Sequence, residues 1–122
     1  MKKEQAKQLI GIYCQEGDLD SLKQVVIKYS QLIDEPDNSD STPLVISIKN
    51  EHYDLANFLL LQGADIDYTN RLNQSALFWA AANNNLEAAF FLLEAGANIN
   101  LIDRVSLDVN IEWMDSVNFS CN

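Results

Sequence analysis

The sequence predicts an all-α fold, a solenoid of stacked helix–turn–helix units with short hairpin loops between them. Two observations lead to this prediction. A pattern of residues returns after 33 positions, and a fixed period of this size is typical of stacked-repeat proteins. Each copy also contains two short stretches with helical spacing of apolar residues, separated by a polar break. With 122 residues, 48% of them apolar, the chain is expected to form one domain over residues 1–122.

Two clear copies of the pattern cover about 38–70 and 71–103. They agree both at their first helix and at the end of their second helix. The recurring segments are Thr42–Leu44 and Ser75–Leu77 at the start, and 59–67 and 92–100 at the end.

The first helix of each copy begins after a hydroxyl side chain, Thr42 or Ser75, of the kind that caps a helix N-terminus. Pro43 follows Thr42 at a position where a missing N–H costs little. We expect these helices to run from Pro43 to about Lys49 and from Ala76 to about Ala82.

The second helix of each copy is expected to run from about Tyr53 to Gln62 and from Leu86 to Ala95. Apolar residues in both segments fall at helical spacing. Gly63 and Gly96 follow, and glycine is the residue that best adopts the left-handed conformation beyond a helix C-terminus.

The two ends of the chain match the pattern less well. An atypical N-terminal repeat over about 4–37 lacks the capping hydroxyl and the glycine that ends the second helix, and its one extra residue is expected near 33–40. After residue 103 the register fails, and we expect a degenerate capping repeat over about 104–122 with a helix near 106–117. Terminal repeats are often atypical because they cover an open core. A truncated chain or a broken reading frame is the alternative explanation for the C-terminal end.

These motifs resemble the ankyrin-repeat family. The matching residues are Thr42-Pro43-Leu44, Leu59-Leu60, Gly63 to Asp67, Ala80-Ala81, Leu92-Leu93 and Gly96 to Asn100. Val45 and Phe78 depart from the family, which usually has a histidine there to tie neighbouring loops together. The resemblance implies about three stacked repeats plus a C-terminal capping helix.

Charge and composition exclude several classes of function. There are 18 acidic and 8 basic residues, for a net charge of −10, which argues against nucleic-acid binding because phosphates need Lys and Arg to replace their counterions. The same charge favours a basic protein partner, although solubility alone is an alternative reason for it. No apolar run is long enough to span a membrane and no signal peptide is recognised. Together with Cys14 and Cys121 as free thiols, this predicts a cytoplasmic protein.

The chain has few residues that are suited to catalysis. It has one histidine, His52, which is expected to be a structural loop residue, and Cys14 is expected to be a small buried side chain. Neither a metal-ligand set nor a glycine-rich phosphate loop is present in the sequence. We therefore predict no enzyme activity, no catalytic or metal-binding residue and no cofactor, with an enzyme kept as a remote alternative.

A binding surface is expected instead on the hairpin loops and the exposed side of the first helices. An acidic cluster lies on the loop before the first clear copy; it is either a solvated loop or a recognition site for a basic partner. Trp79 is either an inter-repeat core residue or a surface anchor. The candidate partner-binding residues are Asp34, Glu35, Asp37, Asp40, Ile46, Lys49, Arg71, Leu72, Gln74, Trp79 and Asn83.

The sequence therefore predicts a non-enzymatic protein–protein interaction module that is monomeric on its own. A narrower hypothesis is a stand-alone acidic inhibitor or immunity-type protein that masks a basic partner. The alternative is an adaptor, or a fragment of a larger ankyrin-repeat scaffold.

Overall fold

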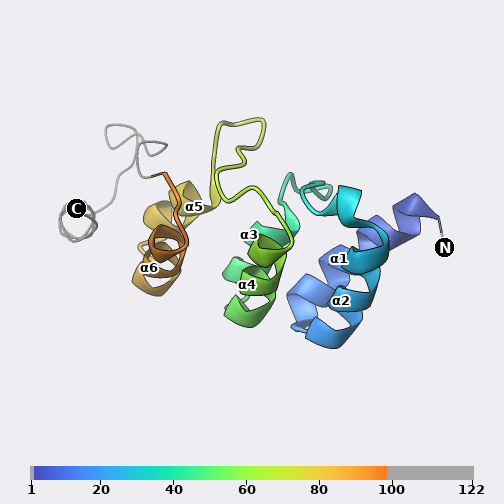
Figure 1. Ribbon diagram of the computed structural model, residues 1–122. Coiled ribbons are helices and arrows are strands. Elements are labelled where there is room, and N and C mark those ends of the chain that lie inside the picture. Colours follow the sequence, from blue (N-terminus) through green and yellow to red (C-terminus); the bar gives the residue numbers. More distant parts are fainter. Residues whose placement is uncertain (1, 99–122) are drawn as a thin grey trace. The chain divides into compact units, whose positions relative to one another are not determined.

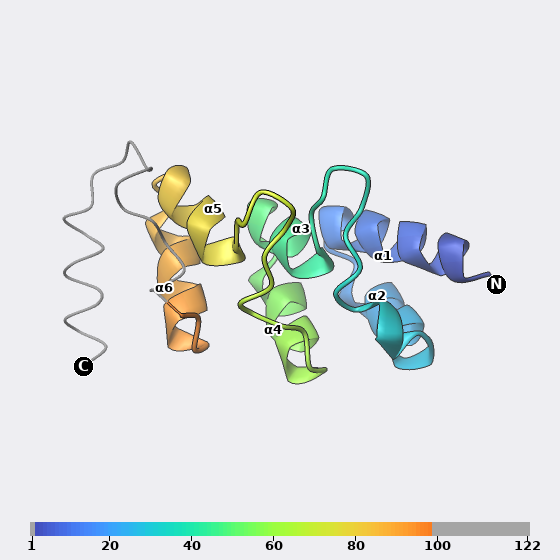
Figure 2. The ribbon, with the colours of Figure 1, turned by 90° about the horizontal axis from the view of Figure 1, so that it is seen from above.

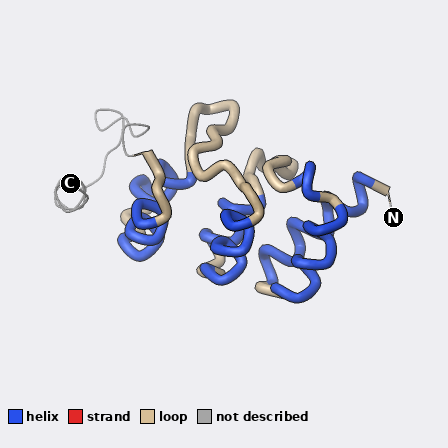
Figure 3. Tube along the Cα trace, in the orientation of Figure 1, coloured by secondary structure: helices blue, strands red, loops and turns tan. Residues whose placement is uncertain are grey.

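The computed structural model describes residues 2–98, and within them the fold contains helices and loops without strands (Figure 3). The predicted all-α repeat fold is thus confirmed. The helix expected near 106–117 lies outside the described residues. The helical elements are α1 (Lys3–Glu16), α2 (Leu19–Lys28), the short 3-10 helix η1 (Ser30–Leu32), α3 (Pro43–Lys49), α4 (Tyr53–Leu61), α5 (Ala76–Ala82) and α6 (Leu86–Glu94).

The helix boundaries follow the sequence signals closely. The bounds predicted for α3 and α5 are confirmed, and α4 and α6 each end one residue earlier than expected. Thr42 and Ser75 cap α3 and α5: each side-chain oxygen accepts a hydrogen bond from the backbone N–H three residues later, at 3.4 and 3.1 Å. A cap of this kind stabilises a helix by about 1 kcal/mol, which matters for helices of only two turns.

Internal contacts divide the chain into two compact units, Met1–Asp65 and Ile66–Asn122. Helices α1 to α4 belong to the first unit, and α5 and α6 to the second (Figure 1). In the first unit α1 packs against α2 and α3 against α4, while α1 also contacts α3 and α2 contacts α4. Figure 2 shows α1 and α3 side by side in this unit. The division into repeats at 4–37, 38–70, 71–103 and 104–122 stays a prediction.

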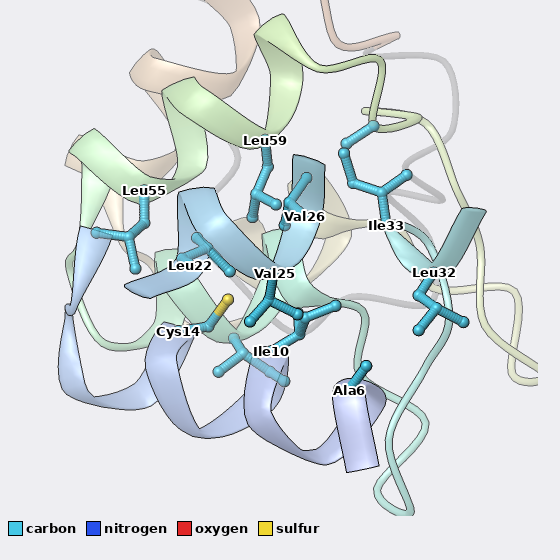
Figure 4. Close-up of a cluster of buried hydrophobic side chains, with 12 residues drawn as sticks. Ala6, Ile10, Cys14, Leu22, Val25, Val26, Leu32, Ile33, Leu55 and Leu59 are labelled. Atoms are coloured by element: carbon cyan, nitrogen blue, oxygen red, sulfur yellow. The ribbon is translucent and has the colours of Figure 1, made fainter. Parts of the chain in front are cut away.

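Apolar side chains from α1, α2, α4 and the segment after α2 meet in the core of the first unit (Figure 4). On each of the three helices the buried residues recur four positions apart, so they share one helix face. They are Ala6, Ile10 and Cys14 on α1, Leu22 and Val26 on α2, and Leu55 and Leu59 on α4, each at most 1% exposed. Burying one large aliphatic side chain contributes about 1.5–3 kcal/mol, so this cluster holds the two helix pairs together.

The second unit has a core of smaller side chains. Its helices α5 and α6 pack against each other, and the alanines at 76, 80, 81, 88 and 89 are at most 2% exposed. Small side chains let two short helices approach closely. Leu77 and Leu92 supply the large buried side chains of this pair.

Left-handed backbone conformations recur at the turns. Gly63 and Gly96 have φ angles of 100° and 102°, as predicted for residues that follow a helix end. The turns between the helices of each pair use Gly17, Glu51 and Asn84, with φ angles of 80°, 62° and 52°. The three helix pairs therefore turn at the same place with the same backbone geometry.

The extra residue of the first repeat does not lie near 33–40, and that prediction was wrong. The loop residues Asp37 and Asn70 make the same hydrogen bonds 33 positions apart, whereas the left-handed turn residues Gly17 and Glu51 are 34 apart. Helix α2 has 10 residues against 9 in α4. It ends at Lys28, and the next residue, Tyr29, has a φ of −123° and leads into η1 instead of turning at a left-handed glycine. The additional residue thus lies where α2 ends and η1 begins.

Candidate protein-interaction surface

The loop before α3, here called the first tip (residues 34–41), is held in shape by Asp37. The Asp37 backbone N–H donates to the Ser41 carbonyl oxygen at 2.9 Å. One oxygen of its carboxylate, Oδ1, accepts from the N–H groups of Ser39 and Ser41 at 2.9 and 3.1 Å. Asp40 completes the turn with a φ of 61°. Part of the predicted acidic cluster therefore shapes the loop.

The loop before α5, the second tip (residues 67–74), repeats this arrangement with Asn70. Its side-chain oxygen accepts from the N–H groups of Leu72 and Gln74 at 3.0 and 2.9 Å, and its amide nitrogen donates to Gln74 Oε1 at 3.0 Å. Asn73 has a φ of 62°. The Asn70 side chain closes the turn through these hydrogen bonds, and Arg71 and Leu72 are exposed on it.

The aspartates that begin the two tips bind the backbone of the next repeat. Asp34 Oδ1 and Oδ2 accept from the Asp65 N–H at 3.1 and 3.2 Å, and Asp67 Oδ1 accepts from the Asn98 N–H at 2.8 Å. Partial burial raises the pKa of Asp34; the hydrogen bond from Asp65 lowers it and the Asp65 charge raises it. Asp34 is thus a structural tie between successive loops as well as a member of the acidic cluster.

A groove of about 310 Å³ runs along the exposed side of α1 beside the first tip. Ile12, 44% exposed, gives it an apolar patch, and Gly11 leaves open space because nothing lies within 4 Å of where its Cβ would be. The groove carries two carboxylates, the Lys7 ammonium group and side-chain amides. Its lining residues are Glu4, Lys7, Gln8, Gly11, Ile12 and Gln15 from α1 and Asp37 and Asn38 from the first tip.

Of the predicted partner-binding residues, only Asp37 lines this groove. The sequence reasoning missed the contribution of α1, because α1 begins well before the first clear copy and most of its lining residues have no counterpart in a motif. One signal was available: Ile12 occupies the same repeat position as Ile46 and Trp79.

The other candidates of the first unit differ in accessibility. Glu35 is exposed and Asp40 is half-buried. Lys49 is exposed, and its ammonium group donates to Ser41 Oγ at 3.5 Å, next to the first tip. Ile46 is only 5% exposed and belongs to the core cluster, so its side chain lies in the core and not on the surface.

In the second unit the candidates form two groups. Arg71, Leu72 and Gln74 lie together on the second tip. Trp79 and Asn83 lie one turn apart on α5, where the Asn83 amide donates to the Trp79 carbonyl oxygen at 2.8 Å. Trp79 is half-buried and Asn83 is exposed, and a partner-binding role for either residue stays a prediction.

His52 and Cys14 have structural surroundings, as predicted. His52 Nε2 lies 3.1 Å from the Gln15 carbonyl oxygen, and a donor to a carbonyl must carry a proton on that nitrogen. Cys14 is fully buried, and burial raises the pKa of its thiol to about 11. A thiol with such a pKa is a poor nucleophile at neutral pH.

Residues 2–98 contain neither a group of three potential metal ligands nor a helix that is long and apolar enough to cross a membrane.

Comparison with known proteins agrees with the repeat pattern. The family model for ankyrin repeats in three copies matches residues 10–103, whereas a comparison with curated proteins gave no match. Ankyrin repeats are protein-interaction modules, and proteins built from them are in general non-enzymatic. With its 33-residue period, its recurring left-handed turns and a match over most of its length, the chain belongs to the ankyrin-repeat family.

Proposed function

We propose that this chain is a non-enzymatic protein-interaction module that binds a basic segment of another protein along the α1 groove and the first tip. The observation that carries the proposal is the groove itself. It brings Glu4 of α1 and Asp37 of the first tip to one hollow, with Ile12 exposed between polar neighbours.

The chemistry of the groove suits a lysine or arginine side chain. A charged head group can bind a carboxylate while the aliphatic stem of the same side chain covers Ile12. The net charge of −10 adds a long-range attraction for a basic partner. Glu35 and Asp40 of the first tip lie close in sequence to Asp37, and they extend the acidic character beyond the groove.

The second unit supplies a further set of contacts in this proposal. Leu72 is 75% exposed on the second tip, beside Arg71. Trp79 is half-buried on α5, and arginine and tryptophan are enriched among the residues that dominate binding energies. The remaining contacts are Gln74, Trp79 and Asn83 of the second unit and Lys49 of the first.

A narrower form of the proposal is that the chain acts alone, as a monomer in the cytoplasm, and inhibits a basic enzyme or toxin by masking it. The charge supports the choice of partner, and the free, buried Cys14 thiol suits a reducing compartment. Affinity capture with the wild-type chain and with an Arg71→Ala/Trp79→Ala variant would identify the partner, whose activity is then measured with increasing amounts of the chain.

The groove can be tested with a fluorescent peptide of alternating Arg and Ala residues, and with its Glu–Ala counterpart as a control peptide. We expect the basic peptide to bind and the acidic peptide not to bind. Glu4→Gln removes one carboxylate from the groove and should weaken binding about fivefold, since a partly exposed charge pair contributes roughly 1 kcal/mol. Glu87→Gln is the matched control, because Glu4 and Glu87 both lie in the first turn of a helix.

Two results would contradict the proposal. If Glu4→Gln and Glu87→Gln weaken binding equally, the peptide responds to the net charge and not to the groove. If affinity for the basic peptide is the same at low and high salt, charge complementarity does not drive the interaction.

A further inference from the structure

Helix α1 has a second hollow beside the groove. It measures about 370 Å³ and is lined by Gln5, Gln8, Leu9 and Ile12. Gln8 and Ile12 also line the groove. These two residues are one helical turn apart and form a ridge, so the two hollows lie on either side of it.

The residues around both hollows have the spacing of a hole in helix packing. Such a hole is formed by residues i, i+3, i+4 and i+7 of one helix, and a side chain of a facing helix inserts into it as a knob. The first hole consists of Gln5, Gln8, Leu9 and Ile12. The second hole lies within the groove and consists of Gln8, Gly11, Ile12 and Gln15. Their centres are about 4.5 Å apart along α1, which is the axial separation of side chains three positions apart on a facing helix.

Gly11 gives the second hole its depth. Its backbone is not left-handed, and a Cβ there would meet nothing within 4 Å, so no contact within residues 2–98 requires glycine at this position. Glycine makes a helix less stable than alanine would. The equivalent residues of α3 and α5 are Val45 and Phe78, both half-buried. The space over Gly11 is therefore best explained by a side chain that comes from another molecule.

The surroundings of the second hole indicate the chemistry of that molecule. Ile12 is 44% exposed beside the hole, which suits a large aliphatic knob. The carboxylates of Glu4 and Asp37 in the same groove suit basic residues next to the knob. Lys7 also lines the groove, so the local charge is mixed, and the inserted side chain, more than charge, has to fix the position of the partner.

We propose, on the basis of the function proposed above, that the basic partner segment binds as an amphipathic helix packed along α1, with a large aliphatic side chain inserted over Gly11. Helix α1 has 14 residues and is about 21 Å long, so a partner helix of about three turns covers both holes. Aliphatic residues three or four positions apart on that helix fill the holes, and basic residues on either side of them face Glu4 and Asp37.

The test compares two fluorescent peptides of equal charge, with the full chain as the binding protein. The first, of about 18 residues so that a helix can form, has leucine at every third or fourth position and arginine and alanine elsewhere. The second has the same sequence with two central alanines replaced by proline, which interrupts a helix. We expect the helical peptide to bind about tenfold more tightly than the proline peptide, and to gain helical circular dichroism on binding.

Gly11→Leu fills the second hole, and Gln24→Leu is the matched control, because Gln24 is exposed on α2 outside the groove. We expect Gly11→Leu to weaken binding of the helical peptide by about tenfold or more, since the knob loses its space. The same variant should raise the thermal unfolding midpoint, since leucine favours a helix over glycine. Gly11→Ala should also raise the midpoint and should weaken binding less, because its side chain is smaller. Gln24→Leu should leave the affinity unchanged.

The helix proposal is overturned, and the proposed function is left intact, if the wild-type chain binds both peptides equally well or if Gly11→Leu binds the helical peptide as tightly as the wild type. Lower unfolding midpoints for both Gly11 variants would also overturn it, because the fold itself would then require glycine. If neither peptide binds the wild-type chain, the proposed function fails and the helix proposal fails with it.

Discussion

Glu51 holds the turn between α3 and α4 in a left-handed conformation with a φ of 62°. The equivalent residues of the other helix pairs are Gly17 and Asn84, which are the residue types that adopt this conformation most easily. An L-residue with a long side chain is strained there by roughly 1–2 kcal/mol. The second helix pair therefore stores strain at a position where the first has none.

Glu51→Gly should raise the free energy of unfolding by about 1 kcal/mol, because glycine releases this strain but gains conformational freedom in the unfolded chain. Urea unfolding measures the effect. Glu51→Ala is the control: it removes the same charge but keeps a Cβ in the left-handed conformation, and it should give no comparable gain. Equal gains from both variants would mean that the charge, and not the backbone, is responsible.

Cys14 should be almost unreactive in the folded protein. Burial raises the pKa of its thiol from 9.0 to about 11, which lowers the thiolate fraction about 100-fold near pH 8. In a Cys121→Ser background, a thiol reagent should react with Cys14 only after denaturant is added. Since the folded pKa lies above the unfolded one, the thiol also makes the protein less stable as the pH rises from about 9 to about 11. Rapid labelling of the native protein would contradict this prediction.

At the scale of elements, the turn between α1 and α2 is in contact with the turn between α3 and α4. The His52 ring lies directly against Gly17: a Cβ on residue 17 would come within 2.7 Å of the His52 ring. Gly17 is also left-handed, with a φ of 80°. Two separate requirements, the backbone angle and the space for His52, therefore call for glycine at residue 17.

A double-mutant cycle separates these two requirements. His52→Ala should cost about 1 kcal/mol through the lost hydrogen bond to the Gln15 carbonyl oxygen, and Gly17→Ala should cost about 2 kcal/mol or more through the clash and the strained angle together. In the His52→Ala background only the angle remains, so Gly17→Ala should then cost about 1 kcal/mol. Thermal unfolding of the four proteins measures the coupling. Strictly additive losses would show that the ring does not restrict residue 17.

The helices could be predicted from the sequence because their signals are local. A capping hydroxyl at Thr42 and a glycine at Gly63 act through bonds and angles within a few residues of the chain. The groove could not be predicted, since it depends on the distance between α1 and a loop more than twenty residues later. Ile46 shows the same limit: its repeat position is exposed at Ile12 but buried in the core at Ile46. The extra residue of the first repeat was misplaced because η1 replaces a turn whose usual signal is a glycine.

For the whole molecule, a net charge of −10 has opposite effects on folding and on binding. Like charges repel one another more strongly in the compact state than in the unfolded chain. Added salt screens both this repulsion and the attraction for a basic partner.

We therefore expect sodium chloride to raise the unfolding midpoint of the chain while it weakens binding of the basic peptide. Thermal unfolding and peptide titration across the same salt series, from about 0.05 to 0.5 M, measure the two effects. Sodium acetate at equal ionic strength is the control for effects specific to chloride. If added salt raises both the unfolding midpoint and the peptide affinity, or lowers both, then long-range charge does not control one of the two.

The ties made by Asp34 and Asp67 have a consequence for how such a chain tolerates change. In each tie the acceptor is a side chain, but the donor, on residue 65 or 98, is a backbone N–H. Every amino acid except proline supplies that donor. The donor positions therefore keep the tie under nearly any substitution, and a copied or exchanged repeat forms the same tie to the repeat after it as long as it carries its own leading aspartate.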